Sequence, residues 1–296
     1  MLLKQYKTHF FDLLKNIQDE QEIESFFFIL TEYLHNLKRI DVALNPDFEI
    51  SDAAIEKWNA ILAQLQQEKP IQYITGEAWF YGLQFEVNEN TLIPRPETEE
   101  LVEWIIESQK SKVKSQKFEI LDIGTGTGCI PISLKANLPH VNVSAIDVSE
   151  KALEVARRNA VSNKVEINFI QTNILEVKDL SQLPTLNSQL PTSFDIIVSN
   201  PPYVRNLEKQ EIKKNVLDYE PHLDLFVEDA DALLFYRKIA QLALKNLSPN
   251  GLLFFEINQY LGKETIELLE NLGFKNIELK KDIYGNDRMI KGCLKL

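Results

Sequence analysis

The segment Phe194-Asp-Ile-Ile-Val-Ser-Asn-Pro-Pro-Tyr203 joins a short apolar run to a polar residue and two prolines. Two isoleucines and a valine within residues 194–198 are typical of a strand that is buried on both faces of a sheet. We therefore predict that Asn200 and the residues after it emerge at the carboxyl end of this strand. In open α/β sheets, ligands bind at that end of the strands.

The residues at this strand end have the chemistry to hold a planar NH₂ group. Proline fixes φ and favours extended geometry in the residue before it, so Asn200 and Pro201 are both held rigidly. The Asn200 side-chain oxygen and the Pro201 carbonyl then offer two acceptors for the two hydrogens of the NH₂ group. Pro202 follows them, and Tyr203 supplies a flat face for stacking. A strand followed by a plain proline turn is the alternative for these residues taken alone.

A glycine-rich loop upstream favours the functional interpretation. Residues 118–123 are predicted to form a strand and residues 129–137 a helix, and the loop between them consists of Gly124, Thr125, Gly126, Thr127 and Gly128. Glycines at this junction let the backbone approach a cofactor and direct free N–H groups toward it. A glycine triplet alone is a weak signal, but this one has the preceding strand and the following helix that the motif requires.

An acid ends the second predicted strand. Residues 141–146 form that strand, Asp147 follows it, and Ser149 caps a helix over residues 150–160. An acid about 20 residues beyond the glycines accepts hydrogen bonds from the ribose hydroxyls of an adenosine. A turn or capping aspartate is the alternative role for Asp147.

A third strand over residues 165–171 leads to Asn173 and Ile174. By position this turn lies beside an adenine ring, and the sequence leaves open whether the two residues contact the base or only form the turn. The fourth strand is the segment quoted above. Later residues predict a helix over 231–247, a turn over 249–251, a strand over 252–257, a helix over 262–271 and strands over 276–280 and 289–296. We therefore expect seven strands with an antiparallel final hairpin.

Three regions are predicted along the chain. Residues 1–68 carry apolar and aromatic residues at helical spacing, with Ser51 as an N-cap, and form a small helical bundle that selects a partner. Residues 69–90 are punctuated by glycine and form a hairpin linker, with an extended segment over 71–74. Residues 91–296 form the catalytic domain.

Loops of the catalytic domain include one that is rigid. Pro94-Arg95-Pro96 presents a guanidinium that can touch a ligand, and Pro96 begins a helix. Polar connections are expected over residues 112–117 and 176–193, and the second is long enough to lie on the surface.

Composition is that of an ordinary globular protein. The 296 residues suffice for a domain of about 200 residues and a smaller one, and 44% are hydrophobic and 26% charged. The net charge of -12 argues against sequence-independent binding to nucleic acid, which needs clustered Lys and Arg. Two cysteines and four scattered histidines indicate neither a disulfide framework nor a metal site and favour a reducing cytoplasm. No apolar run approaches the roughly 18 residues of a membrane span, and no secretory signal is expected.

Three features together resemble a class I S-adenosylmethionine-dependent methyltransferase that methylates amino groups: Asp122-Ile-Gly124-Thr-Gly126-Thr-Gly128, Asp147 and Asn200-Pro-Pro-Tyr203. Within that class the chain is similar to the HemK/PrmC family, through Pro70-Ile-Gln-Tyr-Ile-Thr-Gly76, Leu92-Ile-Pro-Arg-Pro-Glu-Thr-Glu99, Cys129-Ile130, Glu220-Pro221 and Gly285-Asn-Asp-Arg288. The match covers about residues 70–296, and residues 1–68 fit the family's substrate-binding domain.

The resemblance implies a fold and an activity. The fold is a Rossmann-like seven-stranded sheet with an antiparallel last strand, preceded by a helical bundle. The activity is methylation of the glutamine side-chain amide nitrogen (N5) in the Gly-Gly-Gln motif of peptide chain release factors. S-adenosylmethionine is the implied cofactor, and no metal is required.

Site residues can be carried over from the family one by one. The methionine part of the cofactor is lined by Gly124, Thr125, Gly126, Thr127 and Gly128. The other implied cofactor contacts are Asp147 on the ribose, Asn173 and Ile174 at the adenine, and Asn200. The glutamine amide is held by Asn200, Pro201, Pro202 and Tyr203, of which Asn200, Pro201 and Tyr203 are catalytic. The chain departs from the family where Asn173 replaces an acid, residues 228–232 lack glycine and Asn258 replaces another glycine.

Other classes of protein share parts of this pattern. Adenine and cytosine also present an NH₂, so a DNA or RNA amino methyltransferase is the nearest alternative, although the acidic charge and the lack of a basic domain count against it. An NAD-dependent dehydrogenase also has glycines and an acid, but the loop lacks the dinucleotide spacing. A cofactor-binding scaffold without activity would not need the intact Asn-Pro-Pro-Tyr group.

Overall fold

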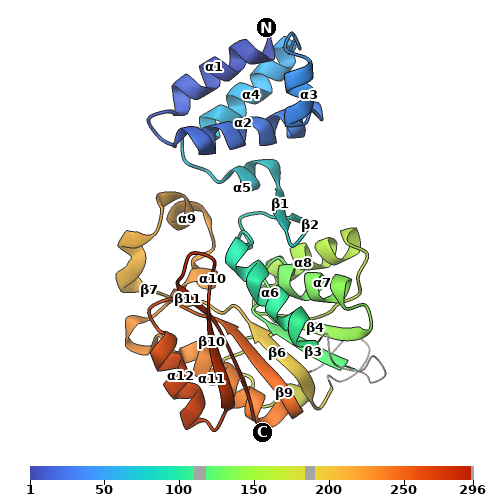
Figure 1. Cartoon of the computed structure of the whole chain (residues 1–296), viewed down its shortest axis with the longest axis vertical. Helices are drawn as coiled ribbons and strands as arrows, with labels where there is room; N and C mark the ends of the chain where they lie inside the picture. The colour runs from blue at the N-terminus through green and yellow to red at the C-terminus, as the bar shows by residue number, and fades with distance from the viewer. Residues whose placement is uncertain (110–117, 184–190, 295–296) are drawn as a thin grey trace. The chain divides into compact units, whose positions relative to one another are not determined.

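The computed structural model describes residues 1–109, 118–183 and 191–294. Its contacts divide the chain into two compact units (Figure 1): Met1–Glu77 with Lys213–Tyr219, and Ala78–Ile212 with Glu220–Leu296. The first unit thus includes a segment from the middle of the chain that the sequence did not assign to it. The predicted division at residues 68 and 90 stays a prediction, and the expected connections over 112–117 and part of 176–193 lie outside the described residues.

The first unit is helical. Tyr219 belongs to it because its hydroxyl donates to the Gln67 carbonyl at 3.0 Å. Ser51 caps a helix as predicted, since its Oγ accepts the Ala54 N–H at 3.3 Å. The helices are α1 (Leu3–Leu14), α2 (Glu20–His35), α3 (Arg39–Leu44), α4 (Asp52–Leu65), α5 (Ile71–Thr75) and α9 (Lys214–Tyr219).

An aromatic cluster forms the core of this helical unit. The ring of Trp58 on α4 has centroids of Tyr6, Phe10 and Phe27 at 5.2, 5.8 and 5.3 Å. All four side chains are buried, and aromatic pairs at these separations stabilise a core beyond their buried area. The predicted helical bundle with an aromatic core is therefore confirmed.

Helix α5 corrects the prediction of an extended segment over residues 71–74. Pro70 lies at the N-cap, where its missing N–H is not needed, and Gly76 ends the helix in the left-handed region at φ 76°. Over so few residues, apolar spacing does not distinguish a helix from a strand. The expected hairpin follows as β1 (Glu77–Phe80) and β2 (Leu83–Glu86).

A seven-stranded sheet forms the centre of the second unit, in the order β10-β11-β9-β6-β3-β4-β5. Strand β11 pairs antiparallel with both of its neighbours, whereas β9, β6, β3, β4 and β5 pair in parallel. This confirms the predicted sheet and its antiparallel last strand. The strands are β3 (Phe118–Ile123), β4 (Val141–Asp147), β5 (Asn168–Gln171), β6 (Phe194–Ser199), β9 (Leu247–Glu256), β10 (Lys275–Lys281) and β11 (Asp287–Cys293).

Helices cover both faces of the sheet (Figure 1). Ile196 and Val198 of β6 pack into one apolar cluster with α6, α7 and α8, while Phe194 and Ile197 pack into another with α11 and α12. Strand β6 is therefore buried on both faces, as predicted. The helices are α6 (Pro96–Gln109), α7 (Cys129–Asn137), α8 (Glu150–Ser162), α11 (Leu234–Asn246) and α12 (Gly262–Asn271).

Short elements link these layers. The strands β7 and β8 pair in parallel as a separate two-stranded sheet. No helix in the described ranges is both long and apolar enough to cross a membrane. The short elements are η1 (Leu180–Gln182), β7 (Val204–Arg205), η2 (Asn206–Glu211), α10 (His222–Leu225), β8 (Phe226–Val227) and η3 (Asp229–Asp231), where η marks a 3₁₀ helix.

Several predicted bounds change for local reasons. Strand β5 is shorter than predicted because Lys164 has φ 58° and the Val165 N–H bonds to the Ala160 carbonyl, which ends α8. The predicted turn over 249–251 lies inside β9 as an irregularity, with Asn250 at φ 82°. Helix α11 begins after the 3₁₀ turn η3, and β11 ends at Cys293; residues 295–296 of the predicted last strand lie outside the described residues.

A substitution at the start of α7 tests how tightly this helix packs. Gly128→Ala is expected to lower the free energy of unfolding by about 1–3 kcal/mol more than Gly285→Ala. Both glycines have left-handed φ, at 79° and 88°, so alanine is strained at each. A Cβ at Gly128 would also lie 3.0 Å from Ile132 and 3.1 Å from Ala156, whereas one at Gly285 would meet nothing within 4 Å. Urea denaturation measures both losses, and equal losses would contradict the packing argument.

Candidate active site

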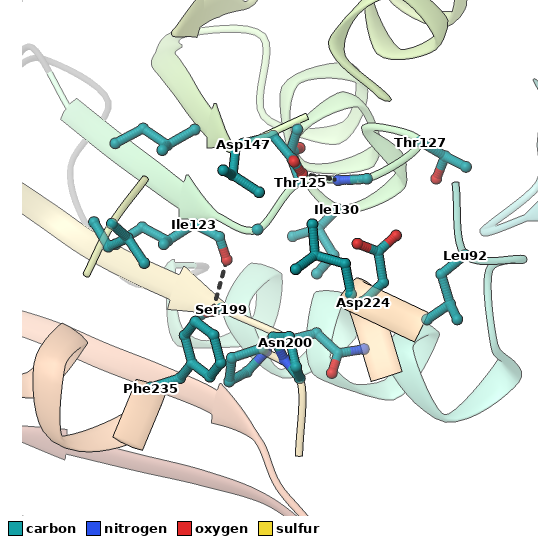
Figure 2. Close-up of a pocket in the computed structure, with 18 of the residues that line it drawn as sticks. Leu92, Ile123, Thr125, Thr127, Ile130, Asp147, Ser199, Asn200, Asp224 and Phe235 are labelled. Carbon is teal, nitrogen blue, oxygen red and sulfur yellow. Dashed lines mark hydrogen bonds between the residues drawn. The ribbon is translucent and has the colours of Figure 1, made fainter. Parts of the chain in front are cut away.

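A cavity of about 220 Å³ lies in the second unit, where the carboxyl ends of β3, β4, β5 and β6 meet (Figure 2). It is lined by residues that directly follow each of these strands. Of the residues predicted for the site, those that line it are Gly124, Thr125, Gly126, Thr127, Asp147, Asn173, Ile174, Asn200, Pro201 and Pro202. Gly128 and Tyr203 are not among its lining residues in the part of the chain that the structure describes.

The glycine loop is tied to the neighbouring strand by its own backbone. The N–H groups of Gly124 and Thr125 both donate to the Ile146 carbonyl, at 2.8 and 3.1 Å. A Cβ added at Gly124 would lie 3.9 Å from the Asn200 carbonyl oxygen, so the loop and the Asn-Pro-Pro segment approach closely. Gly128 instead forms the N-cap of α7 and serves packing.

Asp147 organises this loop with both carboxylate oxygens. Its Oδ2 accepts the Gly126 N–H at 2.8 Å and its Oδ1 accepts the Ser149 N–H at 2.9 Å (Figure 2). Burial raises the pKa of Asp147, and the backbone N–H groups oppose that rise. A carboxylate can accept about four hydrogen bonds, so the capping role leaves acceptor sites for a ligand.

Asn173 and Ile174 both form a turn and line the cavity. The Asn173 Oδ1 accepts the Leu175 N–H at 3.1 Å, and its Nδ2 donates to Glu176 at 3.0 Å. Ile174 is buried in the apolar cluster beneath the cavity. These hydrogen bonds account for the turn, and a contact with adenine stays a prediction.

The Asn-Pro-Pro-Tyr group leaves the sheet beside the glycine loop. Ser199 Oγ donates to the Ile123 carbonyl at 2.6 Å, which joins the ends of β6 and β3 (Figure 2). The Tyr203 hydroxyl donates to Glu256 at 3.1 Å, and burial raises the pKa of Tyr203. Asn258, which stands where a glycine was expected, donates to the Tyr203 carbonyl at 2.9 Å. Stacking of the Tyr203 ring on a substrate stays a prediction.

A second wall of the cavity combines the predicted Pro94-Arg95-Pro96 loop with acids that the sequence analysis did not assign to the site. Glu220, which is 4% exposed, accepts from the Ile93 N–H at 3.1 Å and from Arg95 at 2.5 Å. It thereby joins the Pro94-Arg95-Pro96 loop to the segment before α10, which brings Asp224 into the cavity lining. Arg95 lines the cavity and its guanidinium is held by Glu220; a contact of Arg95 with a ligand stays a prediction.

Asp224 adds an acid that no motif indicated. Burial raises the pKa of Asp224 to about 7, and the nearby charge of Asp147 contributes to the rise. Asp224 lies in the four-residue helix α10, which is too short to give a spacing signal, so only the fold brings this acid to the cavity.

Asp122 lies beneath the glycine loop and is fully buried. Within the described residues, neither of its carboxylate oxygens has a hydrogen-bond partner, and the buried Thr125 hydroxyl has none either. Burial raises the pKa of Asp122 to about 7. The residue Thr125 also lines the cavity.

The sheet order, the glycine loop and the position of the cavity define a class I methyltransferase. The solved hMettl16 catalytic domain in complex with MAT2A 3'UTR hairpin 6 has a similar fold, with a TM-score of 0.56. The two chains are 18% identical, and the match covers 73% of this chain and 77% of that one. This likeness shows the fold alone.

Family models match both units. Residues 7–76 match the model described as PrmC N-terminal domain, and residues 104–221 match the Methyltransferase small domain. The chain is 62% identical to the release factor glutamine methyltransferase of Flavobacterium psychrophilum, over 98% of this chain and 99% of that relative. It is 40% identical to the release factor glutamine methyltransferase of Bacteroides thetaiotaomicron, over 94% and 95%. The chain belongs to the release factor glutamine methyltransferase family.

The buried Asp122 predicts a pH dependence of stability. Its pKa of about 7 exceeds the ordinary 3.8, so the folded protein binds this proton more tightly than the unfolded chain. The stability that the proton contributes is complete below about pH 4 and is lost as the pH rises to 7, by a few kcal/mol in all. Asp122→Asn is therefore expected to gain stability over the wild type across that range. Chemical denaturation at pH 4 and pH 8 without cofactor measures the gain, and a difference independent of pH would contradict the argument.

Proposed function

We propose that the chain transfers the methyl group of S-adenosylmethionine to the side-chain amide nitrogen (N5) of the glutamine in the Gly-Gly-Gln motif of peptide chain release factors. The observation that carries this proposal is the position of Asn200, Pro201 and Pro202 in the lining of a cavity that the glycine loop also lines. A donor for methyl transfer and a planar amide can therefore meet at one place. Membership of the family supports the same reaction.

The cavity lining fits S-adenosylmethionine chemically. Gly124, Thr125, Gly126 and Thr127 would hold the methionine part, since all four line the cavity and the two glycines add no side chain to it. Asp147 would accept the ribose hydroxyls, and Asn173 and Ile174 would border the adenine. When bound, the cofactor supplies a methyl group on a positively charged sulfur.

The protein's contribution to the reaction is placement of the amide. An amide nitrogen is a poor nucleophile because its lone pair is delocalised into the carbonyl. The Asn200 side-chain oxygen and the Pro201 carbonyl would accept its two hydrogens and favour a nitrogen with a localised lone pair. Tyr203 would hold the amide plane in line with the methyl group, and water takes the proton that the methylated nitrogen releases. Catalysis then consists of positioning and electrostatics.

The helical residues 1–68 would recognise the release factor, with residues 69–90 as linker and residues 91–296 as the catalytic domain. The match of residues 7–76 to the PrmC N-terminal domain supports a separate N-terminal domain. We also propose a cytoplasmic location without stable binding to nucleic acid. Two free cysteines and the net charge of -12 support these two points.

Methyl transfer to a purified release factor tests the function directly. With radiolabelled S-adenosylmethionine, the wild-type release factor is expected to become labelled, while one with the Gly-Gly-Gln glutamine replaced by alanine stays unlabelled. The amide of that glutamine is the acceptor, so its loss removes the reaction. Duplex DNA and RNA serve as competing acceptors in the same assay. Greater labelling of either nucleic acid than of release factor would overturn the proposal.

Asn200→Ala tests the acceptor role. Turnover is expected to fall at least about 100-fold because one of the two acceptors for the amide is removed. Cofactor binding, measured by calorimetry, should persist because the glycine loop and Asp147 are unchanged. Asn142→Ala, an exposed position at the amino end of β4, is the matched control and should keep full turnover. Normal turnover in Asn200→Ala would refute the assignment.

A further inference from the structure

A buried carboxylate lies beneath the Asn-Pro-Pro-Tyr group and has no role in the proposal above. Glu256 is the last residue of β9 and is 1% exposed. Its Oε2 accepts the Thr98 hydroxyl at 2.6 Å, and its Oε1 accepts the Tyr203 hydroxyl at 3.1 Å. Both donors are hydroxyl groups, and each carboxylate oxygen is satisfied by one of them. Glu256 therefore contacts Tyr203 directly and approaches Asn200 through Thr98.

The chemistry of these groups sets the direction of every hydrogen bond. Thr98 donates its one hydroxyl hydrogen to Glu256, and a hydroxyl has no second hydrogen to give. The Thr98 oxygen then has only lone pairs to offer a neighbour. Its neighbour is the Asn200 Nδ2, which donates to it at 3.4 Å. Because the nitrogen of Asn200 is directed to Thr98, its oxygen is left for another donor.

We propose that Glu256 and Thr98 are positioning residues that orient the Asn200 carboxamide, with its oxygen toward the substrate amide and its nitrogen toward the protein. The inference rests on the proposed function, because the oxygen matters only if Asn200 accepts from a substrate NH₂. Reversal of the carboxamide would place an NH₂ against the substrate NH₂. Two donors would then face each other, and the substrate would lose one of its two acceptors.

The surroundings hold this arrangement in place. Thr98 is 2% exposed and lies in the first turn of α6, where its N–H bonds to the Arg95 carbonyl at 3.1 Å. Burial raises the pKa of Glu256, and the Thr98 hydrogen bond, the charge of Arg288 and the Tyr203 hydrogen bond all oppose that rise. The first turn of α6, the end of β9 and the segment after β6 thus converge on one carboxylate. A rigid support of this kind determines the geometry of the groups that touch substrate.

Four variants separate orientation from packing. Thr98→Val removes the hydroxyl at nearly constant volume, and Thr98→Ser restores it. Glu256→Gln keeps the shape but replaces one acceptor oxygen with an NH₂ donor, so Thr98 and Tyr203 can no longer both donate to residue 256. Thr265→Val is the matched control, because Thr265 is also fully buried and its hydroxyl donates to a helix carbonyl, Leu261, at 2.7 Å.

Steady-state methyl transfer to release factor gives the first readout. Thr98→Val and Glu256→Gln are each expected to lower kcat at least about tenfold, with affinity for S-adenosylmethionine within about threefold of the wild type by calorimetry. Thr98→Ser is expected to recover most of the turnover, and Thr265→Val to keep it. Wild-type kcat in Glu256→Gln would overturn the inference, as would Thr98→Ser being as slow as Thr98→Val. Thermal denaturation shows which variants fold. If Thr98→Val does not fold, the kcat of Glu256→Gln tests the inference.

The side-chain amide of Asn200 gives a second readout that does not depend on catalysis. In protein labelled with ¹⁵N-asparagine, its NH₂ signals are identified by their loss in Asn200→Ala. They are expected to shift in Thr98→Val and to stay in place in Thr265→Val. Unchanged signals in Thr98→Val would overturn the inference even if release factor is methylated. If the signals shift but the wild type does not methylate release factor, the proposed function is wrong. The hydrogen bond from Asn200 to Thr98 would still be established by the shift.

Discussion

Parallel pairing of β6 with β3 is the interaction on which the rest of the structure depends. It sets Ser199 opposite Ile123, and the hydrogen bond from the Ser199 hydroxyl to the Ile123 carbonyl closes the pair at its carboxyl end. The glycine loop and Asn200 therefore leave the sheet side by side. Strand β9 pairs with β6 in the same direction, with Phe255 opposite Ser199, so Glu256 reaches the same edge. The positions of the glycine loop, Asn200 and Glu256 are thus consequences of one register.

Much of this architecture could be predicted because its signals are local. Apart from Asp195, residues 194–198 are apolar, which is typical of a strand covered on both faces. Caps and breakers mark the ends of the helices. Helices α7 and α12 have the predicted bounds, because Gly128 precedes α7 and Gly273 follows α12. Asp147 and the glycine loop could be identified for the same reason, since each follows a strand that is visible in the sequence.

The second wall of the cavity could not be predicted, because it depends on residues far apart in the chain. Glu220 and Arg95 are separated by 125 positions, and Glu256 and Thr98 by 158. No periodicity relates these pairs, and an acid at 224 is indistinguishable in sequence from a solvated one. The prediction over residues 71–74 was wrong for the opposite reason. The sequence signal of α5 is local, but it is too short to distinguish a helix from a strand.

The chain passes between the two units three times, after Glu77, after Ile212 and after Tyr219. A nick after Glu77 would therefore leave residues 1–77 attached only by their non-covalent contacts with residues 213–219. At the third passage two anchored residues are adjacent in the chain. Tyr219 donates to the Gln67 carbonyl, and the next residue, Glu220, accepts hydrogen bonds from Ile93 and Arg95. A single peptide bond therefore joins a residue anchored in the helical unit to an acid that holds one wall of the cavity in the other unit.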